Sequence, residues 1–426
     1  MVQFMQQDAE SLSRSRATGE RGLLALGVTL GIQAFTSLAA TATAVLAPEI
    51  APTLGISTKL IGVFVGVIYC AAMVASLLSG VFISRHGSIR VSQVCVISCA
   101  IGIALVCGPW WLFVFAPVLI GLGYGPITPA SSHLLVRTAP PRRLALTFSI
   151  KQTGVPLGAA LAGAVLPVLA LSLGWRVSLG MLAVCGLAIA AGAQTTRRAL
   201  DAPEAAGSPV SARALLAPLK LVLQHPRLIE LALAGGFYAA TQLCVMSFLV
   251  VYLTESLARP LVAAGLALTT ANAGGIVGRI LWGAIADRWV APRKMLGLLG
   301  VIAGGCSLAT ASFSPATPSW LLLSVCALFG ASAIGWNGVQ LAEVARQAPE
   351  GQVGPMTGGC GFITFAGVVI GPPLFAALVA LTGNYRVGFA FFAVTTIACG
   401  LWLLSRKSSP KGAGRATRAG GGSGLE

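Results

Sequence analysis

Charged residues are scarce in this chain of 426 residues: they make up 9% of it, whereas hydrophobic residues make up 56%. Soluble globular domains carry about a quarter charged residues, so the composition excludes an ordinary soluble protein. The charges are also one-sided, with 28 Lys and Arg against 12 Asp and Glu. The sequence shows no soluble basic surface with groove-reading elements, so we expect no nucleic-acid partner. The composition predicts a polytopic membrane protein embedded in the lipid bilayer.

Cysteine motifs and catalytic patterns are missing as well. The ten cysteines all fall in apolar stretches and form no Cys-x-x-Cys pair, so we expect no disulfide framework, metal site or cofactor. We interpret them as small side chains that fill helix interfaces. No nucleophile motif or pair of deep carboxylates appears, which makes an enzyme the least favoured class. We also expect no cleavable signal peptide, and residues 420–426 have the composition of a linker left from cloning.

Long apolar runs dominate what remains. A helix needs about 20 apolar residues to span a bilayer, and the runs predict twelve such helices in two sets of six. The predicted parts are an N-terminal arm (1–22), a six-helix bundle (23–193), a linker (194–227), a second six-helix bundle (228–404) and a tail (405–426). The predicted spans are 23–46, 59–83, 91–109, 111–136, 145–170, 174–193, 228–253, 261–286, 295–314, 319–345, 353–381 and 385–404.

The basic residues fix an orientation. If both termini are cytoplasmic, 22 of the 28 bases lie in cytoplasmic segments. The opposite side then carries only four, and two more lie inside predicted helices. Cytoplasmic loops of membrane proteins are enriched in Lys and Arg, so we expect a multi-pass protein of a bacterial-type cytoplasmic (inner) membrane with both termini inside. The four bases outside are Lys59, Arg176, Arg259 and Arg386.

The two bundles repeat each other. The segment from Gly80 to Arg90 after the second helix matches the segment from Gly283 to Arg293 after the eighth, at an offset of 203 residues. Arg137, after the fourth helix, matches Arg346, after the tenth, at an offset of 209. Two matches in the same direction indicate duplicated halves, and such transporters bind substrate between the halves near the midplane.

This arrangement resembles the major facilitator superfamily of secondary transporters over essentially the whole chain. The family has the loop signature Gly-x-x-x-Asp-Arg-x-x-x-Arg-Lys, and Gly283, Asp287 and Arg288 fit its second copy. The resemblance implies that the glycine lets two helices approach closely, and that the acid sits at a neighbouring helix N-terminus and latches the cytoplasmic side. In the first copy Ser84 replaces the acid before Arg85, so we expect a weaker or rearranged latch there.

Two cations lie inside predicted helices. Arg279 is eight residues from Asp287, about 12 Å along a helix, and Lys151 is eight residues past Arg143. Neither has an acid predicted at the same depth. Intramembrane cations are costly and mark functional sites when they face a water-filled cavity, although snorkelling to the interface is the simpler explanation. The charge imbalance favours an anionic substrate.

Arg279 also has a parallel in the family. Monocarboxylate and oxalate transporters of the superfamily resemble this chain in having an arginine in the eighth helix that contacts the substrate carboxylate, with a glycine four residues later, as Gly283 is here. Their partner lysine in helix 1 or 11 is absent, and Lys151 in helix 5 is the candidate replacement. Other polar residues on the predicted helices are further candidate substrate contacts, and interhelical hydrogen bonding is an equally good explanation for them. They are Gln33, Tyr124, Thr128, Gln152, Tyr238, Gln242, Asn272, Trp336, Asn337 and Gln340.

Proton coupling requires a group that titrates. Glu343 is the best carboxylate for this role, since partial burial would make it titratable in the working range. The competing role is a gating ion pair with Arg346 or Arg137. His133 lies near the same end, and a proton carried along with the anion would need no dedicated acid.

We therefore expect an all-α membrane protein with twelve transmembrane helices in two pseudo-symmetric bundles. Its predicted function is secondary transport of a small organic anion, such as a carboxylate, by alternating access, with protons as the candidate coupling ion. We expect a monomer. The alternative in the same superfamily is a proton-coupled drug or metabolite efflux antiporter, and an alternative from another class is a membrane sensor or scaffold that transports nothing.

Overall fold

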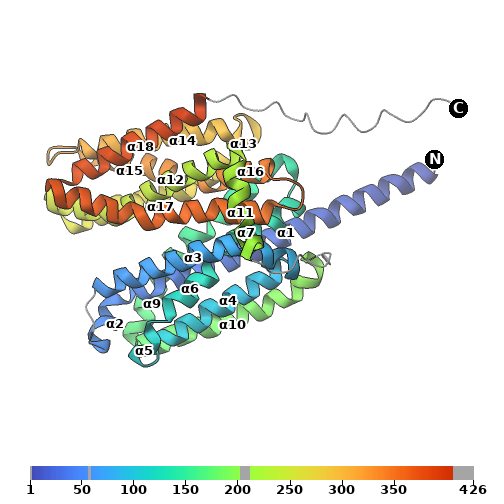
Figure 1. Cartoon of the computed structure of the whole chain (residues 1–426), viewed down its shortest axis with the longest axis horizontal. Helices are drawn as coiled ribbons and strands as arrows, with labels where there is room; N and C mark the ends of the chain where they lie inside the picture. Colours follow the sequence, from blue (N-terminus) through green and yellow to red (C-terminus); the bar gives the residue numbers. More distant parts are fainter. Residues whose placement is uncertain (1, 56–58, 202–211, 406–426) are drawn as a thin grey trace.

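The computed structural model describes residues 2–55, 59–201 and 212–405. These residues form helices and connecting turns, with no strand among them, so the predicted all-α fold is confirmed. Two helical bundles lie one above the other in Figure 1, the N-terminal half below and the C-terminal half above.

The N-terminal half runs from α1 to α10. Hydropathy explains its elements, because each long helix is an apolar segment interrupted mainly by glycine and proline. Its helices are α1 (Val2–Val45), α2 (Ala47–Leu54), α3 (Lys59–His86), α4 (Ser88–Val106), α5 (Trp110–Phe113), α6 (Ala116–Tyr124), α7 (Ile127–Thr138), the 3₁₀ turn η1 (Pro141–Arg143), α8 (Leu144–Gln152), α9 (Gly154–Leu173) and α10 (Trp175–Leu200).

The C-terminal half runs from α12 to α18. It repeats the pattern of long rods and short breaks. Its helices are α12 (Pro226–Val251), the π-helical turn η2 (Tyr252–Ser256), α13 (Leu261–Arg288), α14 (Pro292–Ala311), α15 (Ser319–Ala333), α16 (Asn337–Gln347), α17 (Val353–Thr382) and α18 (Tyr385–Ser405).

Eleven described helical segments are long and apolar enough to cross a bilayer, and they coincide with eleven of the twelve predicted spans. The remaining span, predicted at 261–286, corresponds to α13, a helix of 28 residues. At about 1.5 Å per residue α13 is longer than the roughly 30 Å hydrocarbon core. Arg279 lies within this helix.

Two predicted spans are broken at matching places. The segment 111–136 is interrupted between α6 and α7 at Gly125 and Pro126, and the segment 319–345 between α15 and α16 at Ile334 and Gly335. These positions are related by the same offset of 209 residues that relates Arg137 to Arg346. Discontinuous helices at corresponding places in two repeats mark the substrate site in many transporters.

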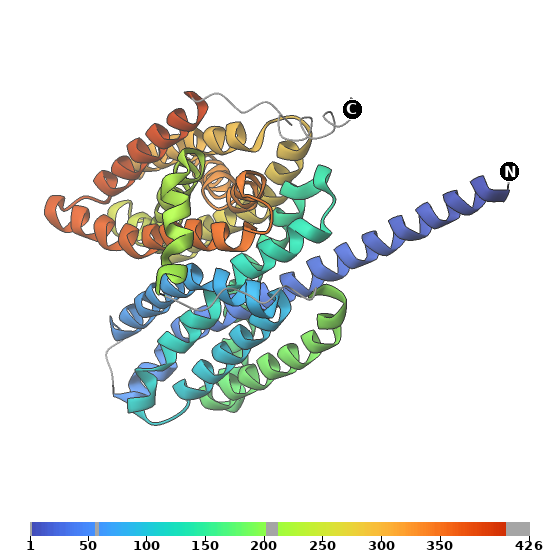
Figure 2. The same cartoon turned by 45° about the vertical axis from the view of Figure 1, so that its right-hand side comes forward.

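The predicted linker, 194–227, contains regular structure. Helix α10 continues to Leu200, and α11 (Ala212–Gln224) forms beyond the segment that the structure leaves undescribed. In both views α11, the yellow-green helix, stands across the boundary between the halves (Figures 1 and 2). It packs on α3 of one half and on α12 and α17 of the other.

The loops rich in bases gather at one end of the molecule, which we call the basic end (residues 85–90, 137–143, 287–294 and 346–353). The halves approach closely there. A Cβ atom added at Gly80 would lie 2.8 Å from the Cα atom of Pro355, and one added at Gly283 would lie 2.7 Å from the Cβ atom of Ser149. Glycine at these two positions therefore allows α3 to contact α17, and α13 to contact α8.

Candidate functional site

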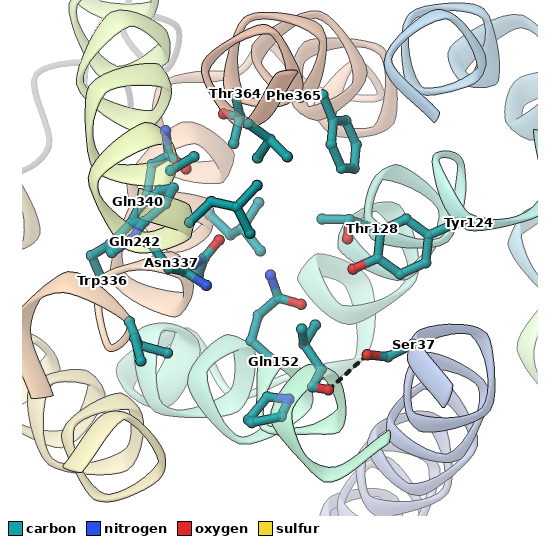
Figure 3. A pocket seen from close by; sticks show the side chains of 18 of the residues that line it. Ser37, Tyr124, Thr128, Gln152, Gln242, Trp336, Asn337, Gln340, Thr364 and Phe365 are labelled. Atoms are coloured by element: carbon teal, nitrogen blue, oxygen red, sulfur yellow. Dashed lines mark hydrogen bonds between the residues drawn. The ribbon is translucent and has the colours of Figure 1, made fainter. Parts of the chain in front are cut away.

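A cavity of about 190 Å³ lies between the halves, beside the helix breaks. Elements of both halves line it, and Figure 3 shows their side chains converging on its centre. Gln152 points into the space from the N-terminal half, and Gln242 and Asn337 lie together on the neighbouring wall, in the C-terminal half. Most polar groups on the wall are amides and hydroxyls, which bind neutral oxygen-rich groups through hydrogen bonds.

Aromatic rings form one wall of the cavity. The ring centroids of Tyr69 and Tyr124 are 6.2 Å apart, and Phe365 lies 6.0 Å from Tyr124 and 6.3 Å from Tyr69. Since Phe365 belongs to α17 and both tyrosines belong to the N-terminal half, this contact joins the halves. Across the cavity Trp336, the residue directly before α16, packs edge-on against Tyr238, with the centroids 5.7 Å apart.

Arg279 is the only charged residue among the described residues that line the cavity. Its side chain is 1% exposed, and its Nη1 atom donates a hydrogen bond to the backbone oxygen of Gln152. Pro156 explains why that oxygen is available: it lacks the amide hydrogen that would normally bond to the carbonyl four residues earlier. The Nε atom of Arg279 has no hydrogen-bond partner among the described residues, and none of their acids forms an ion pair with Arg279.

Lys151 lies directly behind the cavity wall. It is fully buried, and its Nζ atom donates hydrogen bonds to Gln33 Oε1 at 2.6 Å and to Gln152 Oε1 at 3.3 Å. The hydroxyl of Thr128 is 3.5 Å from the same oxygen of Gln33. Both cations therefore contact Gln152, Arg279 through its backbone and Lys151 through its side chain. Lys151 itself does not line the cavity.

The structure places nine of the twelve predicted substrate contacts on the cavity wall. Lys151 and Gln33 lie behind it. Tyr238 lies outside as well, because its hydroxyl donates to the backbone oxygen of Leu296 at 2.9 Å and so points toward α14. The nine on the wall are Tyr124, Thr128, Gln152, Gln242, Asn272, Arg279, Trp336, Asn337 and Gln340.

Sequence reasoning missed the contribution of α3 and α17. Tyr69 and Ser76 line the cavity from α3, and Thr357, Thr364 and Phe365 line it from α17. A single hydroxyl in an apolar helix is a weak signal, since most such groups bond to the preceding turn. The residues at the helix breaks, Gly125, Pro126 and Gly335, give a stronger signal for the cavity than the hydroxyls do. Helix-breaking residues at corresponding places in two repeats indicate a substrate site between them.

Asp287 joins the halves at the basic end. Its carboxylate accepts hydrogen bonds from the backbone amides of Ala145 (3.0 Å) and Leu146 (2.8 Å) at the start of α8, and from Arg346 at 3.0 Å. The side chain of Asp287 is 4% exposed and that of Arg346 is 32% exposed. A carboxylate at a helix N-terminus is stabilised by the unpaired amides and by the helix dipole. Arg288, the next residue, is exposed.

The first copy of the loop is arranged differently. Ser84 is exposed and its hydroxyl donates to Val81 within α3; Arg85 is exposed too. The acid at this loop is Asp201, at the end of α10, which accepts from the amides of Ile89 (2.8 Å) and Arg90 (3.1 Å) at the start of α4. These bonds stay within the N-terminal half.

The predicted ion pair between Glu343 and Arg346 does not form. Arg346 pairs with Asp287 rather than with Glu343, because its α16 position faces the end of α13. Glu343 is buried and accepts a hydrogen bond from Gln347 at 3.0 Å, while Arg137 is exposed at the end of α7. Arg293, at the end of the repeated segment after the eighth predicted helix, is buried against Glu230 in an ion pair. Among the described residues no three His, Cys, Asp or Glu side chains gather to form a metal site.

Comparison with known proteins agrees with this architecture. The sequence profile of the Major Facilitator Superfamily matches residues 29–358. A hexuronate transporter of Bacillus subtilis (strain 168) is 24% identical over 375 residues, which cover 82% of this chain and 86% of that protein.

Solved structures share the fold. The fucose:proton symporter of E. coli superposes with a TM-score of 0.71 at 16% identity, covering 91% of this chain and all of that one. The human organic anion transporter MFSD10 gives a TM-score of 0.67 at 17% identity, covering 91% and 100% of the two chains. A bacterial homologue of the iron transporter ferroportin gives 0.67 at 17% identity, covering 89% and 97%.

Proposed function

Because the chain belongs to the Major Facilitator Superfamily, we propose that this transporter carries a small organic anion, a carboxylate with hydroxyl groups, across the cytoplasmic membrane together with a proton. The cavity walls support this assignment, because they combine one cation with five amide side chains and several hydroxyls. The hexuronate transporter among its relatives is consistent with such a substrate. The aromatic wall of Tyr69, Tyr124 and Phe365 offers an apolar face to a sugar-like ring.

The observation that carries the proposal is the state of Arg279. Its guanidinium is buried at the cavity wall and has no acid partner among the described residues. A buried cation without a counter-ion is costly, and an anion in the cavity would supply the missing charge. The planar guanidinium fork fits a carboxylate with two parallel hydrogen bonds.

The proposed transport cycle follows from the contacts between the halves. If the basic end is cytoplasmic, as the distribution of bases favours, the Asp287 bonds and the close approaches at Gly80 and Gly283 keep the cytoplasmic side shut. Transport then requires the halves to rock so that these contacts break and the cavity opens to the cytoplasm. The efflux antiporter has less support, because the described wall holds no Asp or Glu to attract a cationic drug.

Binding of labelled anions to the purified protein tests the role of Arg279. We expect the protein to bind at least one of D-glucuronate, D-galacturonate and lactate, and we expect Arg279→Ala to weaken that binding about 10- to 100-fold, the effect of losing hydrogen bonds to a charged group. Arg279→Lys should fall between the two, because lysine keeps the charge but loses the fork. Arg198→Ala, which removes an exposed arginine at the end of α10, serves as the matched control.

Two results would contradict the proposal. If Arg279→Ala bound the anions as tightly as Arg198→Ala, Arg279 would not be the anion site. If the unmodified protein bound neutral sugars and none of the carboxylates, the substrate class itself would be wrong.

A further inference from the structure

Lys151 is a fully buried lysine whose described hydrogen-bond partners are all neutral. Gln33 on α1 and Gln152 on α8 accept its hydrogen bonds, and neither carries a charge. The charged or titratable residues on the helices packed against α8 include Arg279 and Asp287 on α13, Glu343 and Arg346 on α16, and His133 and Arg137 on α7. Asp287 is bound to Arg346 and to the start of α8, and Glu343 to Gln347.

Arg279 and Lys151 both donate hydrogen bonds to Gln152, which brings the two basic groups close together. Tyr124 is the other titratable group that faces Arg279. Two like charges in a medium of low dielectric repel strongly, and each also loses its hydration. An arginine guanidinium stays protonated in proteins, whereas a buried lysine can exist as a neutral amine. With the cavity free of anions, the pair is therefore most stable with Lys151 neutral.

We propose that Lys151 is the proton-binding site that couples proton movement to anion binding. An anion next to Arg279 cancels the repulsion, so the Lys151 amine takes one proton from water and becomes an ammonium ion. When the anion leaves, the ammonium returns that proton to water. One proton and one anion thus bind and leave together, which gives symport without a carboxylate in the cavity. This inference rests on the proposed function, since it requires an anion at Arg279.

Gln152 controls the path of the proton. Its side chain points into the cavity (Figure 3), and its Oε1 atom accepts the bond from Lys151, so the amide stands between the amine and the cavity. A rotation of this side chain connects Lys151 to cavity water. Since the backbone oxygen of the same residue holds Arg279, displacement of the Gln152 amide by a bound anion links the two events directly.

A measurement of proton uptake on anion binding tests this role. It uses a pH-sensitive dye in weakly buffered solution, with D-glucuronate as the probe, or with D-galacturonate or lactate if one of these binds more tightly. The unmodified protein should take up about one proton per anion bound. Its affinity for the anion should fall as the pH rises, by up to tenfold per pH unit in the range where Lys151 titrates. Lys151→Gln should bind and exchange the anion with no proton uptake and with an affinity that does not vary with pH. Lys220→Gln, which removes an exposed lysine on α11, should behave as the unmodified protein does.

Gln33→Glu provides a second variant of nearly the same shape. A carboxylate in contact with the Lys151 ammonium should hold it charged at all times, so anion binding should again proceed without proton uptake. Unchanged proton uptake in either variant would overturn the coupling role, and so would a folded Lys151→Gln protein that binds no anion at any pH, because Lys151 would then be an anion ligand or a structural contact.

The two proposals fail in different ways. If the unmodified protein binds an anion through Arg279 but takes up no proton, only the role of Lys151 is wrong. If it binds none of the three carboxylates, the proposed function fails and the coupling role fails with it.

Discussion

The two copies of the basic-end loop have taken different roles. In the C-terminal half Asp287 reaches across to the N-terminal half and accepts hydrogen bonds from the start of α8. At the corresponding position of the N-terminal half, 203 residues earlier, Ser84 bonds only to its own helix among the described residues. Both loops nevertheless bring a glycine against a helix of the other half, Gly283 against α8 and Gly80 against α17.

The difference shows what each part of the loop signature does. The glycine sets the distance between helices in both copies, whether or not an acid follows. The acid adds directional bonds across the boundary, and it does so only in the second copy. In the first copy Asp201 caps a helix of its own half, which stabilises that half but cannot resist separation of the two. We infer that two kinds of contact oppose opening of the basic end. At α8 these are the polar bonds of Asp287, and at α17 the contact is mainly packing around Gly80.

The largest expected effect comes from removing the acid that crosses the boundary. Asp287→Ala should lose the two amide bonds and the contact with Arg346, worth about 2 kcal/mol together. The population with an open basic end should then rise about thirtyfold, and amide hydrogen exchange at residues 145 and 146 should accelerate by a similar factor. Exchange measured by mass spectrometry on the α8 peptide would show this.

Glu350→Ala is the matched control for Asp287→Ala, because it removes an exposed acid from the same end. If both variants exchanged at the same rate at α8, the Asp287 bonds would not hold the halves together.

A smaller and more local effect is expected at the first copy. Asp201→Ala should remove the cap of α4, at a cost of about 1 kcal/mol, and exchange at residues 89 and 90 should rise about fivefold. Exchange at the start of α8 should not change, since Asp201 bonds within one half. Acceleration at both sites would instead mean that the two caps belong to one cooperative unit.

Much of the fold could be predicted from hydropathy alone, since the spans follow from apolar length. The breaks at Pro126 and Gly335 were missed because an apolar stretch of about 20 residues still predicts one span when it contains one or two helix-breaking residues. Helix α11 was missed for a different reason: its segment is short, contains Pro218, and becomes a helix by packing on both halves. Tertiary contact of this kind overrides local propensity.

The candidate site was predicted less completely. Residue type and depth identified Arg279 as a cavity candidate, but depth along a helix does not say which way a side chain points. Tyr238 therefore turned out to face α14, and Lys151 to lie behind Gln152. To predict the bond between Arg279 and Gln152, one would have to know that α13 passes the carbonyl that Pro156 leaves free. That proximity comes from the packing of the two halves.

The smallest expected effect would come from restoring the missing acid. Ser84→Asp should place a carboxylate at the last turn of α3, beside the start of α17, where Gly80 and Ile83 already approach Pro355 and Gly354. The first amides of a helix have no partner within that helix, and Ser84 is exposed, so we expect a gain of about 0.5 kcal/mol. Exchange at residues 353 and 354 should slow about twofold, whereas Ser84→Asn, without the charge, should show less. Unchanged exchange at α17 in Ser84→Asp would mean that the first copy has lost the geometry of the latch as well as its acid.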